Sequence, residues 1–161
     1  MSSRARRLAP SSRPADDTEL TLGGTDAALD AALEAELTAY NVVACGIDDQ
    51  RELTLQARAG DGSLLAGLSG WTWGTAAGIT LLWVREDQRG SGWGTRMLEA
   101  AEREARARGC VQVMVSSMTF QAPGFYERHG YVETGRSEGV PVAGMADVHL
   151  AKDLTSGVGG S

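Results

Sequence analysis

Residues 84–95 read Val-Arg-Glu-Asp-Gln-Arg-Gly-Ser-Gly-Trp-Gly-Thr, and this stretch decides the fold. An apolar run precedes it and a helical pattern follows it, so three alternating glycines, Gly90, Gly92 and Gly94, stand between a strand and a helix. Glycine lets the backbone turn its amide N–H groups toward a ligand, and a helix start adds unpaired donors and the positive end of a dipole. The stretch therefore predicts a site for a phosphate-bearing ligand.

Two common phosphate-binding loops do not fit this spacing. A dinucleotide-binding loop needs Gly-x-Gly-x-x-Gly, but Thr95 stands three positions after Gly92, and no acidic residue occupies a convincing later strand end. A P-loop needs a lysine after its last glycine, and none follows here. The pattern that remains is Arg89-x-x-Gly92-x-Gly94.

A second motif lies downstream, where residues 120–131 read Phe-Gln-Ala-Pro-Gly-Phe-Tyr-Glu-Arg-His-Gly-Tyr. It places Tyr126 on a short helix, four residues before Gly130 and an aromatic residue. Together the two motifs resemble those of the GNAT acetyltransferase superfamily, in the same order and at the same spacing. The motifs cover roughly residues 79–136, and the flanking strand pattern extends the resemblance to most of the chain.

Hydrophobic periodicity predicts an α/β (α+β) domain with a mixed sheet. Helices are expected over 25–40, 92–108 and 123–129, strands over 18–22, 51–59, 64–73, 79–84, 111–115, 131–135 and 145–150, a loop over 41–50, and turns at 61–62 and 74–78. The continuously apolar run 79–84 is typical of a strand buried on both faces. The resemblance implies a mostly antiparallel twisted sheet with flanking helices, in which strands 79–84 and 111–116 run parallel and splay apart at their C-terminal ends.

Length and composition indicate one domain. The chain has 161 residues, 42% of them hydrophobic, which allows a core over residues 15–155. Residues 1–14 are rich in Pro, Ser and Arg without the apolar run of a secretory signal, and residues 156–161 are mostly Gly and Ser, so both are expected to be flexible tails. No apolar run approaches the roughly 18 residues of a membrane span. We therefore expect a cytoplasmic protein without a membrane partner.

Charge argues against a nucleic-acid partner. The net charge is −6, and residues 1–14 hold four of the 15 basic residues and no acidic one, which leaves 11 basic against 21 acidic residues and a charge of −10. Binding to DNA or RNA needs a basic face, whereas an acidic surface suits a cationic substrate or serves solubility. Cys45 and Cys110 do not have the spacing of metal ligands, and with two histidines in the chain no metal is expected.

The resemblance implies acetyl-CoA as co-substrate. In the family the pantetheine arm bonds to strand backbone, here near Trp83, and the pyrophosphate lies on amides at the start of the helix. The cofactor-binding residues are therefore expected to be Trp83, Val84, Arg89, Gly90, Ser91, Gly92, Trp93, Gly94, Thr95 and Phe120.

Acetyl transfer to an amine requires removal of a proton from the amine, a donor for the oxyanion and a proton for the departing thiolate. The resemblance assigns the last task to Tyr126, and the alternative is an aromatic residue that packs the helix on the sheet. Glu86 is the candidate general base, with a chain of waters as the alternative. A strand N–H near Val84 would serve the oxyanion, and His129 is expected to be a cap or packing residue.

Residues for the acceptor are expected in the first helix-to-strand connection and on a tryptophan-bearing strand. The candidates are Tyr40, Asp48, Asp49, Trp71 and Trp73. The two acids suit a cation, and the two tryptophans share one strand face, where they would form a wall for a ring-bearing substrate or, as the alternative, a core or dimer contact.

The 67–73 strand and the 120–126 segment are similar to small-molecule acetyltransferases of soil bacteria, some of which inactivate antibiotics. This similarity favours an N-acetyltransferase for a small cationic amine, including an aminoglycoside-type antibiotic, with a role in antibiotic resistance. A protein or peptide N-acetyltransferase and a non-catalytic acyl-CoA-binding module stay open as alternatives. A homodimer through the C-terminal strands is a further expectation.

Overall fold

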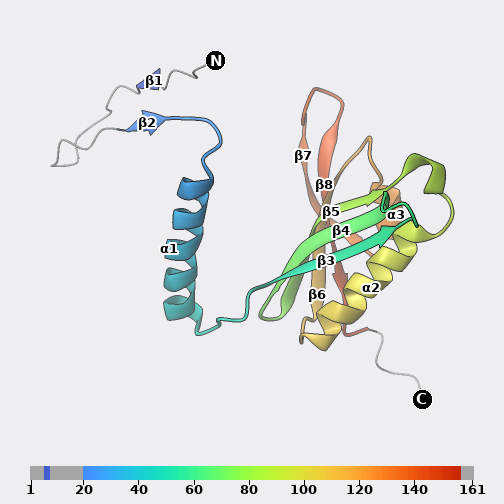
Figure 1. Cartoon of the computed structure of the whole chain (residues 1–161), viewed down its shortest axis with the longest axis horizontal. Coiled ribbons are helices and arrows are strands. Elements are labelled where there is room, and N and C mark those ends of the chain that lie inside the picture. Colours follow the sequence, from blue (N-terminus) through green and yellow to red (C-terminus); the bar gives the residue numbers. More distant parts are fainter. Residues whose placement is uncertain (1–5, 8–19, 157–161) are drawn as a thin grey trace. The chain divides into compact units, whose positions relative to one another are not determined.

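The computed structural model describes residues 6–7 and 20–156, which belong to two compact units, Met1–Gly46 and Ile47–Ser161 (Figure 1). Each unit is described by itself. The remainder of the predicted tails, residues 1–5, 8–14 and 157–161, lies outside the described residues. Within the described part of the chain, no helix combines the length and the hydropathy that a membrane span requires.

The first unit contains one long helix, α1 (Ala27–Cys45), after a two-residue pairing of β1 (Arg6–Arg7) with β2 (Thr21–Leu22). Asp26 caps the helix, since its carboxylate accepts bonds from the amides of Ala28 and Leu29 at 3.1 and 3.0 Å. The helix continues past Tyr40 to Gly46, whose φ of 72° ends it. The predicted loop over 41–50 is therefore wrong for residues 41–45, because no Gly or Pro interrupts the helix before Gly46.

The second unit is a six-stranded sheet of order β3-β4-β5-β6-β8-β7, in which the β5–β6 pair is parallel and the other pairs are antiparallel. The strands are β3 (Arg51–Arg58), β4 (Leu64–Trp73), β5 (Ala76–Val84), β6 (Gln112–Met118), β7 (Val132–Glu138) and β8 (Ala146–Asp153). The helical elements are η1 (Glu86–Gln88), α2 (Trp93–Ala107) and α3 (Pro123–Arg128). The predicted fold class, a mixed and mostly antiparallel sheet with flanking helices, is confirmed.

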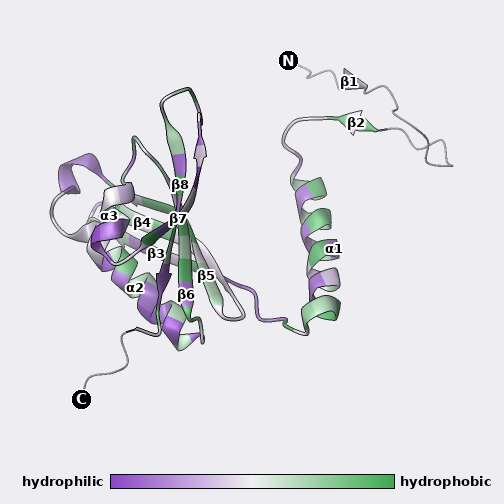
Figure 2. Ribbon diagram, turned by 180° about the vertical axis from the view of Figure 1, so that it is seen from behind, coloured by the Kyte–Doolittle hydropathy of each residue, from purple (hydrophilic) through white to green (hydrophobic). Residues whose placement is uncertain are grey.

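Helix α2 packs one face against β3, β4 and β5 and encloses the core of this unit (Figure 1). Its buried apolar residues are Met97, Leu98, Ala101 and Ala105. Figure 2 shows hydrophobic and hydrophilic segments alternating along α2. Gly109 has a φ of 87°, and the amide of Cys110 bonds to the carbonyl of Ala105 at 2.9 Å, so this glycine ends the helix expected over 92–108.

Strand β5 differs from its prediction in two ways. It begins at Ala76, so the turn predicted over 74–78 is confined to Gly74 and Thr75. Its second half is not buried on both faces, since Leu81 is 67% and Trp83 is 45% exposed. Leu82 and Val84 pack against the core on the side of α2, whereas the opposite face of the strand, which carries Leu81 and Trp83, stays exposed.

A partly buried ion pair joins α2 to β8. Lys152 of β8 donates to both carboxylate oxygens of Glu102 at 2.9 and 2.7 Å, and Tyr131 is buried beside them with no hydrogen-bond partner for its hydroxyl among the described residues. Burial, and next the negative charge of Glu102, raise the pKa of Tyr131 above its ordinary value. The fold therefore holds this phenol in its neutral form.

We expect Tyr131→Phe to leave the free energy of unfolding at pH 7 unchanged or to raise it by about 1 kcal/mol, because a buried hydroxyl without an acceptor is removed. The pKa of Tyr131 is higher in the folded protein than the unfolded value of about 10. Its contribution to the free energy of unfolding is therefore fully present below about pH 10 and is lost as the pH rises above that value. Urea unfolding at neutral and at alkaline pH would test this. A variant that loses more stability than the wild type in alkali would contradict it.

Candidate functional site

The parallel strands β5 and β6 separate at their C-terminal ends. Their pairing stops at Ile79 and Val115, although β5 runs on to Val84 and β6 to Met118. The pairing of β4 with β5 is irregular at the same point, and it leaves Thr80 of β5 without a partner on β4. This irregularity bends β5, and its backbone beyond Ile79 has no strand partner on the β6 side among the described residues. The splayed pair that the family resemblance implied is confirmed.

Unpaired backbone donors stand where β5 leads into α2. The amides of Gly90, Gly92, Trp93, Gly94 and Thr95 have no acceptor within the described part of the chain. Gly90 and Gly92 have φ values of 78° and 86°, a left-handed backbone that other residues rarely adopt. The N-cap offers no side-chain bond, and the first turn holds no acidic residue. The turn therefore presents several free donors to an anion, as the glycine spacing predicts.

The start of α2, the end of β5 and α3 converge. A Cβ on Gly94 would lie 3.2 Å from the ring of Phe125 and 3.9 Å from Val84, so this glycine permits the close approach of α3. Trp93 packs against the core, with the Arg96 guanidinium 4.0 Å from its ring centre. The predicted cofactor residues of β5 and of the loop thus lie beside the helix that carries Tyr126. Phe120 is exposed in the turn after β6.

Tyr126 is 7% exposed and its ring packs edge-on against Phe125 and Tyr131, at centroid distances of 5.2 and 5.6 Å. Burial raises the pKa of this phenol above its usual value near 10, so it is protonated at neutral pH. Its hydroxyl has no partner among the described residues and, unlike that of Tyr131, it is not sealed from solvent. The ring of Tyr126 therefore packs in the core, as expected if it only holds the helix on the sheet, but its hydroxyl is also free to donate a proton.

His129 follows Tyr126 and joins two helices. Its Nδ1 lies 2.7 Å from the carbonyl of Phe125, and its Nε2 lies 3.0 Å from Thr95 Oγ1 in the first turn of α2. A carbonyl only accepts, so Nδ1 carries the proton, and the Nε2 of a neutral ring accepts from the Thr95 hydroxyl.

The charged residues of the 85–89 loop have different surroundings. Glu86 is exposed in η1, and no described residue bonds to its carboxylate. Asp87 is held by the Arg85 guanidinium at 2.6 and 2.8 Å, which lowers the pKa of this carboxyl. Arg89 donates through Nε to the carbonyl of Val84 at 3.3 Å, so it braces the loop on the end of β5. Glu86 is thus the free carboxylate of this loop.

Trp71 and Trp73 lie on the face of the sheet opposite α2. The indole of Trp71 covers Gly78, where a Cβ would approach it to 2.4 Å. Gly78 pairs with Met114, directly before the point where β5 and β6 separate. Trp71 therefore lies beside the splay, whereas Trp73 is opposite Ala76 at the turn.

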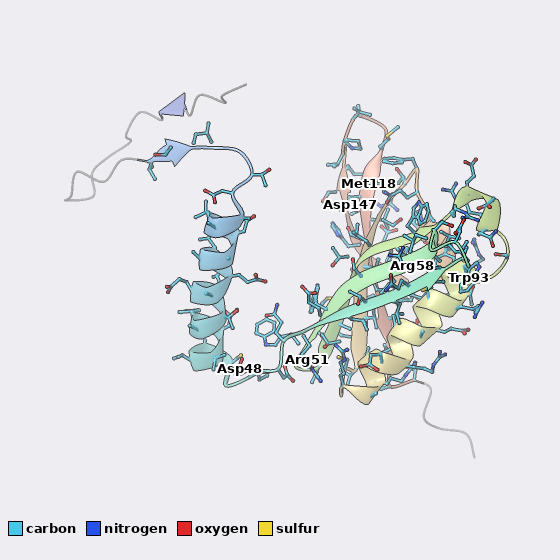
Figure 3. All side chains as sticks on the ribbon, in the orientation of Figure 1. Asp48, Arg51, Arg58, Trp93, Met118 and Asp147 are labelled. Carbon is cyan, nitrogen blue, oxygen red and sulfur yellow. The ribbon has the colours of Figure 1, made fainter. Side chains whose placement is uncertain are left out.

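The structure does not bring the acidic candidates to the splay. Asp49 accepts a bond from the amide of Gly74 at 2.8 Å, at the start of β5 and away from Val84. Asp48 lies at the beginning of β3, whereas Trp93 lies near its far end, as Figure 3 shows. Tyr40 belongs to the first unit, on α1.

The sequence reading missed a polar pair at the end of β6. Ser116 donates to Asp147 of β8 at 2.7 Å, and Asp147 is the strand partner of Met118, next to which Figure 3 shows it. His149 shares this face and lies 3.3 Å from Ser137 of β7. Alternation along β8, with buried Ala146, Val148 and Leu150, was the signal that these side chains point away from the core. In the described residues no group of three or more possible ligands could hold a metal ion.

Known acetyltransferases are similar to this chain in sequence. Residues 51–133 match the family described as acetyltransferase (GNAT) domain. An acetyltransferase of Agrobacterium fabrum is 37% identical over 110 residues, which are 68% of this chain and 80% of that protein. The blasticidin-S acetyltransferase of Streptomyces morookaense is 45% identical over 74 residues, 44% of this chain and 52% of that protein.

A solved structure extends this likeness to the fold. The crystal structure of an acetyltransferase from Agrobacterium tumefaciens superposes with a TM-score of 0.76 at 33% identity, over 83% of this chain and 97% of that one.

Proposed function

Since the chain belongs to the GNAT family of acetyltransferases, we propose that this N-acetyltransferase moves the acetyl group of acetyl-CoA to the primary amine of a small cationic molecule. The observation that carries the proposal is the set of unpaired amides in the Gly90–Thr95 turn, where β5 leads into α2 and where α3, the helix that carries Tyr126, packs against Gly94. Backbone donors at a helix start suit a diphosphate, and the family uses acetyl-CoA.

In this proposal the diphosphate lies on the amides of the 89–95 turn, and the pantetheine arm follows the unpaired backbone of β5 near Trp83 and Val84. The thioester then reaches the separation of the two strands. A strand N–H near Val84 donates to the oxyanion. Arg89 acts through the loop that it braces, and Phe120 borders the arm from the end of β6.

The reaction is a direct attack. The acceptor amine loses a proton to water or to Glu86, the free carboxylate of the loop, and its nitrogen attacks the thioester carbonyl. The attacking nitrogen then loses its second proton to solvent, and the tetrahedral intermediate collapses with cleavage of the carbon–sulfur bond to leave a neutral amide. Tyr126 gives its proton to the departing thiolate and recovers one from solvent.

A small cationic acceptor is supported by four observations. The relatives include a blasticidin-S acetyltransferase, and the chain without residues 1–14 has a charge of −10. Trp71 offers an aromatic surface beside the splay, and Asp147 offers a carboxylate at the end of β6. We therefore infer that the acceptor is a ring-bearing amine of the antibiotic kind, held between an aromatic and an acidic residue.

We expect Asp147→Asn to raise KM for a cationic acceptor about tenfold, with a small effect on KM for acetyl-CoA, because a charge-assisted contact of roughly 1.5 kcal/mol is lost. Steady-state kinetics with each substrate varied in turn would measure both constants. Glu138→Gln is the matched control, since it removes a neighbouring exposed carboxylate from β7. An equal rise of KM in the control would show a general effect of surface charge.

Release of free thiol from acetyl-CoA, measured against a panel of amines, tests the proposed function. The panel contains blasticidin S, aminoglycosides, polyamines and peptides with free amino termini. Release that depends on one class of small amine supports the proposal. Release with peptides would favour a protein acceptor, and silence across the panel would contradict acetyl transfer to these amines.

We also propose a homodimer, because β7 is an edge strand with most of its side chains exposed. Light scattering of the purified full chain would give its mass.

A further inference from the structure

His129 is the link between the two parts of the proposed site. Its two ring nitrogens contact different helices, since Nδ1 donates to the carbonyl of Phe125 in α3 and Nε2 lies 3.0 Å from the hydroxyl of Thr95 in α2. The ring is half-buried and packs against Phe125 at a centroid distance of 4.5 Å. Both hydrogen bonds therefore hold the imidazole in one orientation.

Thr95 and Phe125 are the residues through which such a link would act. Thr95 contributes one of the unpaired amides of the turn, and its side-chain hydroxyl is hydrogen-bonded to His129. Phe125 directly precedes Tyr126 in the chain. A hydrogen bond between Thr95 and His129 thus fixes the distance from the anion-binding turn to the phenol.

Helix α3 needs a tertiary contact of this kind. It has six residues, and its N-cap Ala122 makes no side-chain bond. Helices this short are marginal without packing. The contact of Phe125 with Gly94 is apolar and has little directionality, whereas the His129–Thr95 hydrogen bond is directional.

We propose that His129 is a positioning residue, which sets the reach of Tyr126 to the thiolate by tying α3 to the first turn of α2. This role rests on the proposed function, since it needs a proton transfer from Tyr126. Such a transfer requires a donor–acceptor distance of about 2.6–3.2 Å, and an error of about 1 Å can lower the rate as much as 100-fold.

Two substitutions separate the two bonds of the imidazole. His129→Asn keeps a donor near the position of Nδ1 and loses the bond to Thr95. His129→Gln keeps an acceptor near the position of Nε2 and loses the bond to Phe125. Thr95→Val removes the same interhelical bond from the other side and retains the backbone amide of the turn.

We expect His129→Asn and Thr95→Val each to lower kcat about tenfold, with KM for acetyl-CoA within about twofold of the wild type. His129→Gln is expected to retain most of kcat. The double variant His129→Asn/Thr95→Val should be no slower than either single variant, because both remove one bond. Thermal unfolding of each variant provides the control for folding.

The decisive measurement repeats His129→Asn in a Tyr126→Phe background. If His129 acts through Tyr126, the second substitution has no further effect on kcat. A further tenfold loss, or a rise in KM for acetyl-CoA with kcat unchanged, would overturn the positioning role and leave the proposed function intact. If Tyr126→Phe alone does not lower kcat, the proton-donor step of the proposed function is wrong, and so is this inference.

Discussion

Tyr126→Phe is expected to lower kcat by a factor of about 10² to 10³ and to leave the dissociation constant of acetyl-CoA within about twofold of the wild type. General acid catalysis contributes a factor of about 10² to 10⁴, and a phenylalanine has no proton to give. The turn from Gly90 to Thr95 is unchanged by this substitution, so the donors proposed for the diphosphate remain.

The structure gives two reasons for an effect of this size. The phenol carries its proton at neutral pH, and its hydroxyl has no protein acceptor among the described residues and is not sealed from solvent. Removing the hydroxyl breaks no described hydrogen bond, so the substitution should change the chemistry more than the fold. Stopped-flow or steady-state thiol release, together with calorimetric binding of acetyl-CoA, would measure the two effects separately.

Tyr131→Phe is the matched control for this prediction. It also removes one phenolic hydroxyl from a buried ring of the same cluster, but that hydroxyl is sealed from solvent. We expect it to retain kcat. Equal losses in the two variants would mean that the cluster is needed for folding, and it would contradict a proton-donor role specific to Tyr126.

Gly92→Val is expected to weaken acetyl-CoA binding about 100-fold. Gly92 has a φ of 86°, which a β-branched residue adopts only with strain, so the backbone of the turn must move. Moving it re-aims the amides of Gly92 and Trp93, and losing two hydrogen bonds to a charged group at about 1.5 kcal/mol each corresponds to a factor near 100.

Gly109→Val supplies a matched comparison at the other end of α2. Gly109 has a φ of 87°, and a Cβ on either glycine would meet no atom within 4 Å. Both variants therefore carry the same kind of backbone strain and should lose comparable stability. Calorimetric titration should show weaker binding only for Gly92→Val. A comparable loss of affinity in Gly109→Val would attribute the effect to destabilisation and not to the turn.

Local chemistry explains what the sequence predicted well. The alternating glycines of the 90–94 turn and the helix expected over 92–108 depend on neighbouring residues, so each can be read from a short window. The splay of β5 and β6 came from the family resemblance and is confirmed by a pairing that ends at Ile79.

Features that depend on distant residues were not predicted. Nothing in the sequence near Glu102 indicates that its carboxylate pairs with Lys152 of β8. Asp49 was expected to contact substrate, but its carboxylate accepts a bond from the amide of Gly74. Asp147 was not singled out, because only the pairing of β8 with β6 brings it to the end of β6. In each case the partner is supplied by strand order, which hydrophobic periodicity does not contain.

The central claim is that acetyl moves from acetyl-CoA to an amine on this chain. The most direct test uses acetyl-CoA with a deuterated acetyl group and the amine selected by the thiol-release panel, with mass spectrometry of the amine. We predict one labelled acetyl group on the amine nitrogen for each free thiol. Thiol release without labelled amine would mean hydrolysis of the thioester, and it would contradict the account.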